Sequence, residues 1–187
     1  MKKNPIVGCM RWGVWGENFT TNQYETIINQ CLSIGLNVFD HADIYGHYTT
    51  EADFGEALKG KSSLRQQIKL ITKCGINMIT TNRPNHAIKS YDTSATHIKK
   101  SVEQSLQNFH TDYIDTLLIH RPDLLLNPEE VASTILELIA AGKIKSFGVS
   151  NFNTHQVSKL TKHIPIKHHQ IEISVTNMKA FDDGVLD

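Results

Sequence analysis

The chain has 187 residues, enough for one domain with a sizeable core, and its 40% hydrophobic and 20% charged residues are ordinary for a folded protein in water. The formal net charge is zero and the 10 histidines are scattered, so the composition indicates neither a nucleic-acid-binding face nor a membrane-surface patch. We find no secretory signal and no membrane-length apolar segment, and therefore expect a cytoplasmic protein.

The cysteines indicate neither disulfides nor a metal site. Cys9, Cys31 and Cys74 are odd in number and lack the paired spacing of metal ligands. We interpret them as reduced thiols in a reducing compartment.

The first half of the chain alternates short apolar runs with amphipathic stretches. A helix is predicted between Thr21, as its N-cap, and Gly35, which stops it. Strands are expected at residues 6–10, 37–39 and 68–72, and a second helix at about 50–59.

A loop of about twenty residues follows Lys73 and contains Arg83, Pro84 and Asn85. It is longer than most connections in compact domains, which is typical of a lid or binding loop. A solvated insertion explains it equally well.

The second half continues the alternation. Asn127 and Pro128 are a capping residue and a first-turn proline, and they predict a helix that ends at Gly142. Further helices are expected at 98–109 and about 155–163, and strands at 113–119, 144–149 and 171–175. The tail has no clear pattern.

Strand and helix thus alternate six times without a dividing linker, which predicts one α/β domain over residues 1–187 with parallel strands. Right-handed crossovers leave two architectures, an open doubly wound sheet and a barrel. The pattern does not choose between them.

Four polar side chains stand at or just beyond predicted strand ends: Asp40, Tyr45, Lys73 and His120. In a parallel sheet or barrel these ends share one face, so the four can converge there. Each also has an ordinary structural explanation, as a turn cap, an interface aromatic, a solvated lysine and a core histidine respectively. Their shared face favours a functional site.

The chemistry of such a group is that of carbonyl reduction. Tyrosine has a reference pKa of about 10, and a lysine about 4 Å away can lower it by up to about three units before burial opposes the shift. Asp40 would hold Lys73 charged, and His120 could donate a hydrogen bond to a polarised oxygen.

Four motifs resemble the aldo-keto reductase family. They are Phe-Asp-His-Ala-Asp-Ile-Tyr-Gly at 39–46, Leu-Ile-Thr-Lys-Cys-Gly at 70–75, Asp-Thr-Leu-Leu-Ile-His-Arg-Pro-Asp at 115–123, and Phe-Gly-Val-Ser-Asn-Phe at 147–152. The resemblance covers nearly the whole chain, from Ile6 to about Val175. It implies an eight-stranded (β/α) TIM barrel and NADPH-dependent reduction of a small aldehyde or ketone.

Carried over by position, the resemblance implies that Tyr45 is the general acid, that Lys73 and Asp40 support it, and that His120 orients the carbonyl. A second set of positions is implied to face the cofactor: Ser150, Asn151 and Gln170 at the nicotinamide carboxamide, and Met10 and Arg11 beside it. His41 stands where many members have threonine.

The chain is short for such a barrel, which normally needs about 250 residues. About six of the eight β/α units are present, and the loops after the seventh and eighth strands, which the resemblance assigns to the cofactor's phosphates, have no counterpart. We expect a truncated sequence; a shortened gene product and completion by a second copy are the alternatives.

Because the chain is short, we expect it to bind NADPH weakly or not at all on its own. We also expect the first and sixth strands to be exposed edges. The pattern specifies neither the substrate, nor NADPH over NADH, nor the oligomeric state.

Two rival interpretations remain. Some members of the family are non-catalytic regulatory subunits of membrane channels, although the presence of all four catalytic positions argues against that role here. An unrelated parallel α/β protein could also mimic the motifs.

Overall fold

The structure is a computed structural model that describes residues 5–182 and 184–186. Six parallel strands form one sheet in the order β1-β2-β3-β6-β7-β8. Their bounds are Val7–Gly8 (β1), Val38–Asp40 (β2), Lys69–Cys74 (β3), Thr116–Ile119 (β6), Phe147–Ser150 (β7) and His168–Gln170 (β8). The spatial order follows the chain without the reversal that defines a doubly wound sheet, so the sheet is six strands of a barrel.

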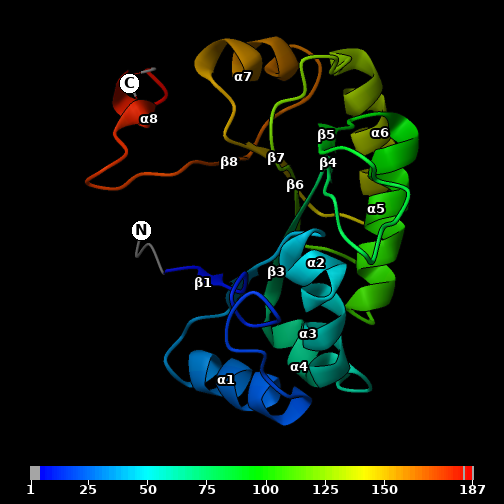
Figure 1. The fold of residues 1–187 in the computed structure, drawn as a ribbon, viewed down its shortest axis with the longest axis vertical. Helices are drawn as coiled ribbons and strands as arrows, with labels where there is room; N and C mark the ends of the chain where they lie inside the picture. The colour runs from blue at the N-terminus through cyan, green and yellow to red at the C-terminus, as the bar shows by residue number, and fades with distance from the viewer. Residues whose placement is uncertain (1–4, 183, 187) are drawn as a thin grey trace.

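Helices cover the outside of this curled sheet, and the side between β1 and β8 is open (Figure 1). The covering helices are α1 (Thr21–Ser33), α3 (Thr50–Leu58), α5 (Ala95–Asn108), α6 (Pro128–Ala140) and α7 (Thr154–Thr161). Shorter elements are α2 (Tyr45–Tyr48), α4 (Ser62–Gln67) and α8 (Lys179–Asp182). In the described residues, no helix is long and apolar enough to span a bilayer.

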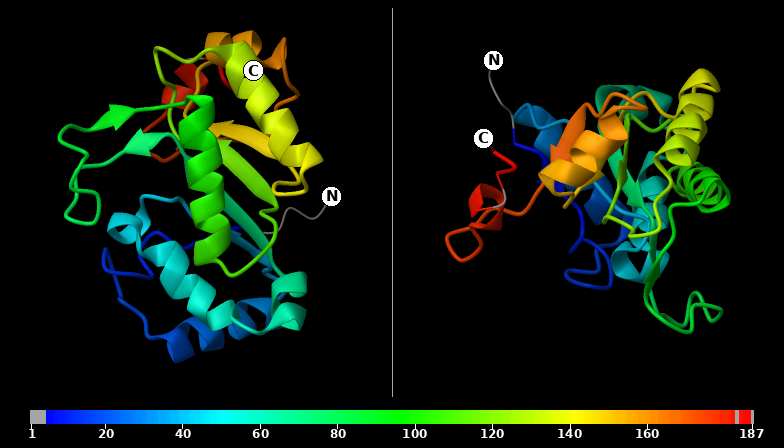
Figure 2. Two further views of the ribbon diagram at one scale, coloured as in Figure 1. Left: turned by 90° about the vertical axis from the view of Figure 1, so that its right-hand side faces the viewer. Right: turned by 90° about the horizontal axis from the view of Figure 1, so that it is seen from above.

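The long connection after β3 is partly ordered into an antiparallel hairpin of β4 (Ile76–Asn77) and β5 (Ser90–Tyr91). Figure 2 shows it projecting beyond the helices. The hairpin was not predicted, because two strands of two residues each leave no periodic pattern to detect.

Apolar side chains fill the space between sheet and helices in two main clusters. One gathers Phe39, Phe54 and Phe109 around α1, α3 and β2, and the other joins α5 and α6 to β6 and β7. Helices α3 and α5 approach closely at Gly55, where an added Cβ would lie 1.8 Å from the carbonyl oxygen of Asn108. Glycine at this position therefore allows the two helices to touch.

Helix caps explain two of the element boundaries. The N-cap of α1 is Thr20, one residue before the predicted Thr21, because Thr20 and Gln23 form a reciprocal capping box. The predicted cap of α6 is confirmed, since the Asn127 side chain accepts from the backbone N–H groups of Glu129 and Glu130.

The predicted position of the sixth strand is wrong. The strand is β8 at His168–Gln170, where Ser150 of β7 pairs with Gln170, and not the apolar run 171–175. Val175 is 98% exposed, so the run lies outside the sheet. The prediction relied on apolar residues, and β8 consists of polar residues, so the neighbouring apolar run was taken for the strand.

Candidate active site

Asp40 and Lys73 form a buried ion pair at the carboxyl ends of neighbouring strands. Asp40 ends β2, and Lys73 is the penultimate residue of β3. The Lys73 Nζ donates to Asp40 Oδ1 at 2.8 Å, to Oδ2 at 2.9 Å and to the carbonyl oxygen of His41 at 2.7 Å. Lys73 is only 2% exposed, and a buried ammonium requires such partners because it has lost its hydration.

Tyr45 completes the coordination of this ammonium. Lys73 Nζ donates to Tyr45 Oη at 3.1 Å, and the tyrosine is 8% exposed. The chain turns sharply just after it, since Gly46, His47 and Tyr48 all have positive φ, between 58° and 70°. Left-handed conformations cost roughly 1–3 kcal/mol at non-glycine residues, so surrounding contacts must hold this turn.

Tyr48 links the turn to the hairpin through two hydrogen bonds. Its Oη accepts from the N–H of Met78 at 2.9 Å and donates to the carbonyl of Ile76 at 3.1 Å. The hairpin after β3 thus supports the backbone that carries Tyr45.

His120 follows β6 directly and faces the tyrosine. Its backbone N–H donates to Cys74 at the end of β3, and its ring lies edge-on to the ring of Tyr45 with centroids 6.0 Å apart. Burial first, then the positive charges of Lys73, Arg121 and Lys89, lower the pKa of His120 to about 3, so the imidazole is neutral. Its Nδ1 is buried without a partner among the described residues, which leaves Nε2 to meet a ligand.

The expected lowering of the tyrosine pKa is wrong in its net direction. Burial raises the pKa of Tyr45 above its ordinary value, although the charge and the hydrogen bond of Lys73 oppose this. Lys73 does lie against Tyr45 as expected, but desolvation outweighs its charge, and desolvation depends on how tightly the whole site is packed.

Ser150, Asn151 and Gln170 lie together at the ends of β7 and β8. Asn151 has φ 61° and donates from Nδ2 to Ser150 Oγ at 2.7 Å and to the His120 carbonyl at 3.3 Å. Gln170 Nε2 donates to Asp40 Oδ2 at 3.2 Å, so it also joins the ion pair. That link between β8 and β2 was not predicted.

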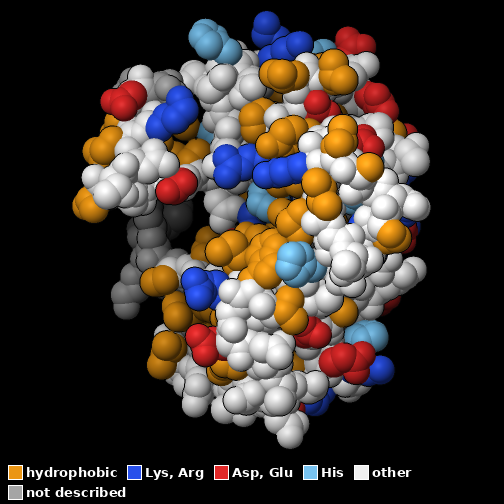
Figure 3. Space-filling view, viewed as in Figure 1, with side chains coloured by type: hydrophobic (Ala, Val, Ile, Leu, Met, Phe, Trp, Pro, Cys, Tyr) orange, Lys and Arg blue, Asp and Glu red, His pale blue; other side chains and the backbone are white. Residues whose placement is uncertain are grey.

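A cavity of about 570 Å³ brings these residues together. Its lining includes Tyr45, Lys73, His120, Ser150, Asn151 and Gln170, and also Met10. Asp40, which is bonded to Lys73, is not among the lining residues, and neither is Arg11. The face in Figure 3 has a hollow with hydrophobic side chains below it and Lys and Arg side chains along its upper side.

Several residues that line this cavity were not predicted from the sequence. Trp15, Lys89 and Arg121 are three of them, and Lys89 comes from the hairpin segment. Arg121 follows His120 and could have been inferred from that adjacency. Lys89 carried no signal, because only the fold brings residue 89 to the strand ends.

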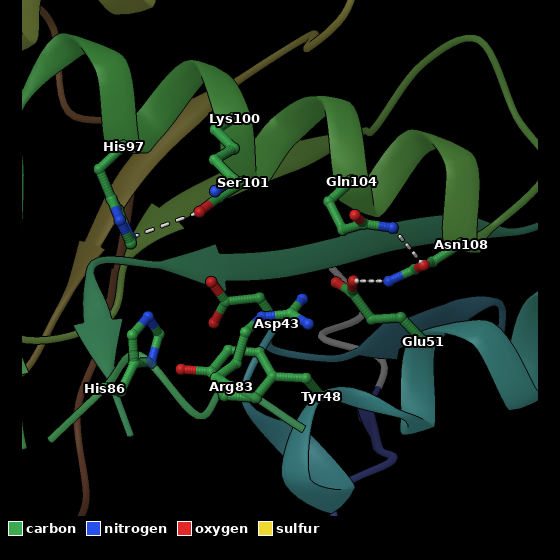
Figure 4. Close-up of a pocket in the computed structure, with 10 residues that line it drawn as sticks. All are labelled: Asp43, Tyr48, Glu51, Arg83, His86, His97, Lys100, Ser101, Gln104 and Asn108. Atoms are coloured by element: carbon green, nitrogen blue, oxygen red, sulfur yellow. Dashed lines mark hydrogen bonds between the residues drawn. The ribbon is translucent and has the colours of Figure 1, made fainter. Parts of the chain in front are cut away.

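A second cavity, of about 90 Å³, lies between α3, α5 and the hairpin segment (Figure 4). Glu51 on its wall is 1% exposed and accepts hydrogen bonds from Thr72 at 2.5 Å, Ser105 at 2.9 Å and Asn108 at 3.1 Å. Burial raises the pKa of this carboxyl. Its donors come from β3 and α5, so Glu51 connects three elements.

Among the described residues, no three His, Cys, Asp or Glu side chains are grouped to hold a metal ion. Ser150, Asn151 and Gln170 instead present hydroxyl and amide groups to the large cavity. Such groups suit a planar carboxamide, which both donates and accepts hydrogen bonds.

The sequence matches the model of the aldo/keto reductase family over residues 6–186. Among curated relatives, the oxidoreductase YcsN of Bacillus subtilis is 46% identical over 97% of this chain. A 6-dehydroglucose reductase of Agrobacterium fabrum is 40% identical over 94% of it.

Solved structures share the fold. A glycerol dehydrogenase from Gluconobacter oxydans superposes on 95% of this chain with a TM-score of 0.80 and 28% identity. An aldo-keto reductase from Bacillus halodurans, in its holo form, also superposes on 95% of this chain, with a TM-score of 0.78 and 27% identity. The chain spans 60% and 61% of the two curated relatives and 54% and 55% of the two solved chains.

Proposed function

The chain belongs to the aldo/keto reductase family, and we propose that it supplies the proton-transfer part of a site that reduces an aldehyde or ketone to an alcohol with NAD(P)H. The observation that carries this proposal is the contact of Lys73 Nζ with both Asp40 and Tyr45 Oη, next to the ring of His120. Tyr45, Lys73 and His120 line the cavity, and Asp40 reaches it through its bond to Lys73.

Tyr45 is the proposed general acid. Its raised pKa keeps the phenol protonated at neutral pH, so nearly every molecule carries the proton to be donated. As the carbonyl oxygen becomes an alkoxide, Tyr45 Oη gives up its proton and becomes a phenolate. The Lys73 ammonium already donates to that oxygen, and a charge-assisted hydrogen bond of this kind is worth about 1.5–3 kcal/mol.

His120 is the proposed orienting group. Because its pKa is about 3, the ring is a neutral hydrogen-bond donor and does not compete with Tyr45 as an acid at neutral pH. A donor at Nε2 would fix the carbonyl oxygen beside the tyrosine and stabilise its growing negative charge.

Ser150, Asn151 and Gln170 are the residues proposed to hold the nicotinamide carboxamide. Gln170 already donates to Asp40, and Asn151 to Ser150, which leaves the Gln170 and Asn151 side-chain oxygens as acceptors. When bound, the nicotinamide supplies the hydride that reduces the carbonyl carbon. We propose NADPH as the cofactor, on the resemblance of the motifs.

Replacing Tyr45 with phenylalanine tests the acid. We expect Tyr45→Phe to reduce NADPH-dependent carbonyl reduction by about 10²-fold or more, because the proton donor is lost while the packed ring remains. The rates are measured with NADPH and NADH in the 187-residue chain and in a chimera where residues 6–186 replace the matching part of the Bacillus subtilis relative.

The matched control is Tyr113→Phe, a half-buried tyrosine on the loop before β6. Its activity should equal that of the parent. Retained activity in Tyr45→Phe would overturn the assignment of the acid. Nicotinamide binding without turnover of any carbonyl by the chimera would overturn the enzymatic proposal and favour a regulatory role.

A further inference from the structure

Two cationic side chains with no assigned role line the large cavity. Lys89 precedes β5 in the hairpin segment, and Arg121 directly follows His120. Both are exposed, and neither forms an ion pair with any described residue. Lys73, in contrast, is neutralised by Asp40.

Both side chains line the same cavity as Tyr45 and His120, where the carbonyl is proposed to bind. Each contributes to lowering the pKa of His120, which requires both to lie within electrostatic range of the ring. They come from opposite directions along the chain, one from the hairpin and one from the end of β6. A ligand held at His120 would therefore lie in a cavity that both cations line.

Among the described residues, one carboxylate in the lining offsets them. Glu172, after β8, faces the same cavity and also forms no ion pair with a described residue. With Lys73 balanced by Asp40, the part of the lining that the structure describes retains two cations and one anion without an ion-pair partner. An anionic group fits this balance, and arginine offers a planar fork of donors that matches a carboxylate or phosphate.

We propose that Lys89 and Arg121 form an anion-recognition site, and that the substrate class is an aldehyde or ketone bearing a carboxylate or phosphate a few bonds from the carbonyl. This rests on the proposed function, since it assumes that the carbonyl is bound at Tyr45 and His120. Apolar aldehydes would leave both cations without a partner.

Binding is measured first, because it does not depend on turnover. The 187-residue chain is titrated with 4-hydroxybutanoate and with its neutral counterpart butane-1,4-diol, and the NMR signals of Trp15 and His120 are followed. We expect the anion to bind about tenfold more tightly at low ionic strength, with an advantage that shrinks as salt screens the charges.

Three variants decide whether these two side chains are responsible. The double variant Lys89→Gln/Arg121→Gln should lose most of the preference for the anion, and Lys162→Gln, an exposed lysine after α7, should keep it. Glu172→Gln should strengthen anion binding, a gain that a folding defect cannot produce. Equal binding of both ligands, or an unchanged preference in the double variant, overturns the proposal.

A kinetic arm separates this inference from the proposed function. In the chimera, kcat/KM is compared for succinic semialdehyde and butanal with NADPH, and the double variant should lower their ratio about tenfold. Equal values in the parent would overturn anion recognition and leave the reductase intact. Anion binding that depends on Lys89 and Arg121, without reduction of any carbonyl, would support the site and overturn the reductase.

Discussion

At the scale of single residues, the most unusual environment is that of His41. The side chain is 0% exposed and packs edge-on against Phe54 and Phe109, with ring centroids 4.5 Å and 5.1 Å away. Neither ring nitrogen has a partner among the described residues. Burial, with a smaller contribution from Lys73, lowers its pKa from 6.5 to about 3, so the ring is a neutral core side chain.

This environment predicts a pH dependence of stability. Below pH 6.5 the unfolded chain binds a proton at His41 and the folded chain does not. The stability is therefore fully present above that pH and falls as the pH is lowered towards 3, by about 1.4 kcal/mol per unit. We expect His41→Leu to make the decline shallower by that amount, measured by urea unfolding between about pH 7 and pH 5.

The control is His163→Gln, an exposed histidine after α7, which should keep the parental slope. An equal slope in parent and His41→Leu would show that the ring is protonated, or accessible to water, in the folded state.

At the scale of elements, the region around the site depends on α3, which approaches α5 at Gly55 and carries Glu51. The Glu51 carboxylate accepts hydrogen bonds from Thr72, Ser105 and Asn108. Thr72 precedes Lys73 on β3, so the same contacts that join α3 to α5 also position the strand that carries the lysine.

Removing this carboxylate should destabilise the protein strongly. Glu51→Ala leaves buried hydroxyl and amide groups without their acceptor, and we expect a loss of about 2–4 kcal/mol in the free energy of unfolding. Denaturant unfolding measures it. Glu56→Ala, on the same helix, removes an exposed carboxylate that pairs with Lys59 and His110. Because exposed ion pairs contribute little, the midpoint should change by much less than in Glu51→Ala, and equal effects of both variants would contradict the proposed role of Glu51.

At the scale of the whole molecule, the described sheet has two ends, and the expected exposure of its first and sixth strands is confirmed. Strand β1 pairs only with β2, and β8 only with β7. Hydrophobic side chains next to both strands are exposed, among them Ile6 at 52% and Ile173 at 49%. The open side of the curl lies between them (Figure 1).

This geometry predicts an uneven pattern of amide hydrogen exchange in the 187-residue chain. Backbone amides of β3 and β6, which have neighbours on both sides and buried side chains, should exchange slowest, while those of β1 and β8 should exchange by local opening. Mass spectrometry of exchange at several protein concentrations checks this. Protection of β1 and β8 that rises with concentration would show pairing between copies.

Much of the site was predictable from local pattern. Asp40, Lys73 and His120 were located because apolar runs that form strands end at or next to them, and parallel strands bring such ends to one face. Asn127 and Gly142 likewise mark the two ends of α6, because helix caps are interactions between residues close in the sequence. The apolar spacing of the helices likewise follows from 3.6 residues per turn.

The alternation of strands and helices, and the polar side chains at strand ends, therefore follow from local patterns in the chain. Four features depend on the folded arrangement as a whole: the strands follow chain order in a curled sheet, Gln170 reaches Asp40, Lys89 reaches the cavity, and burial raises the pKa of Tyr45. The difference lies in the sequence separation of the interacting residues. Periodicity and capping act within a few residues, while strand order and desolvation depend on everything that packs around a group.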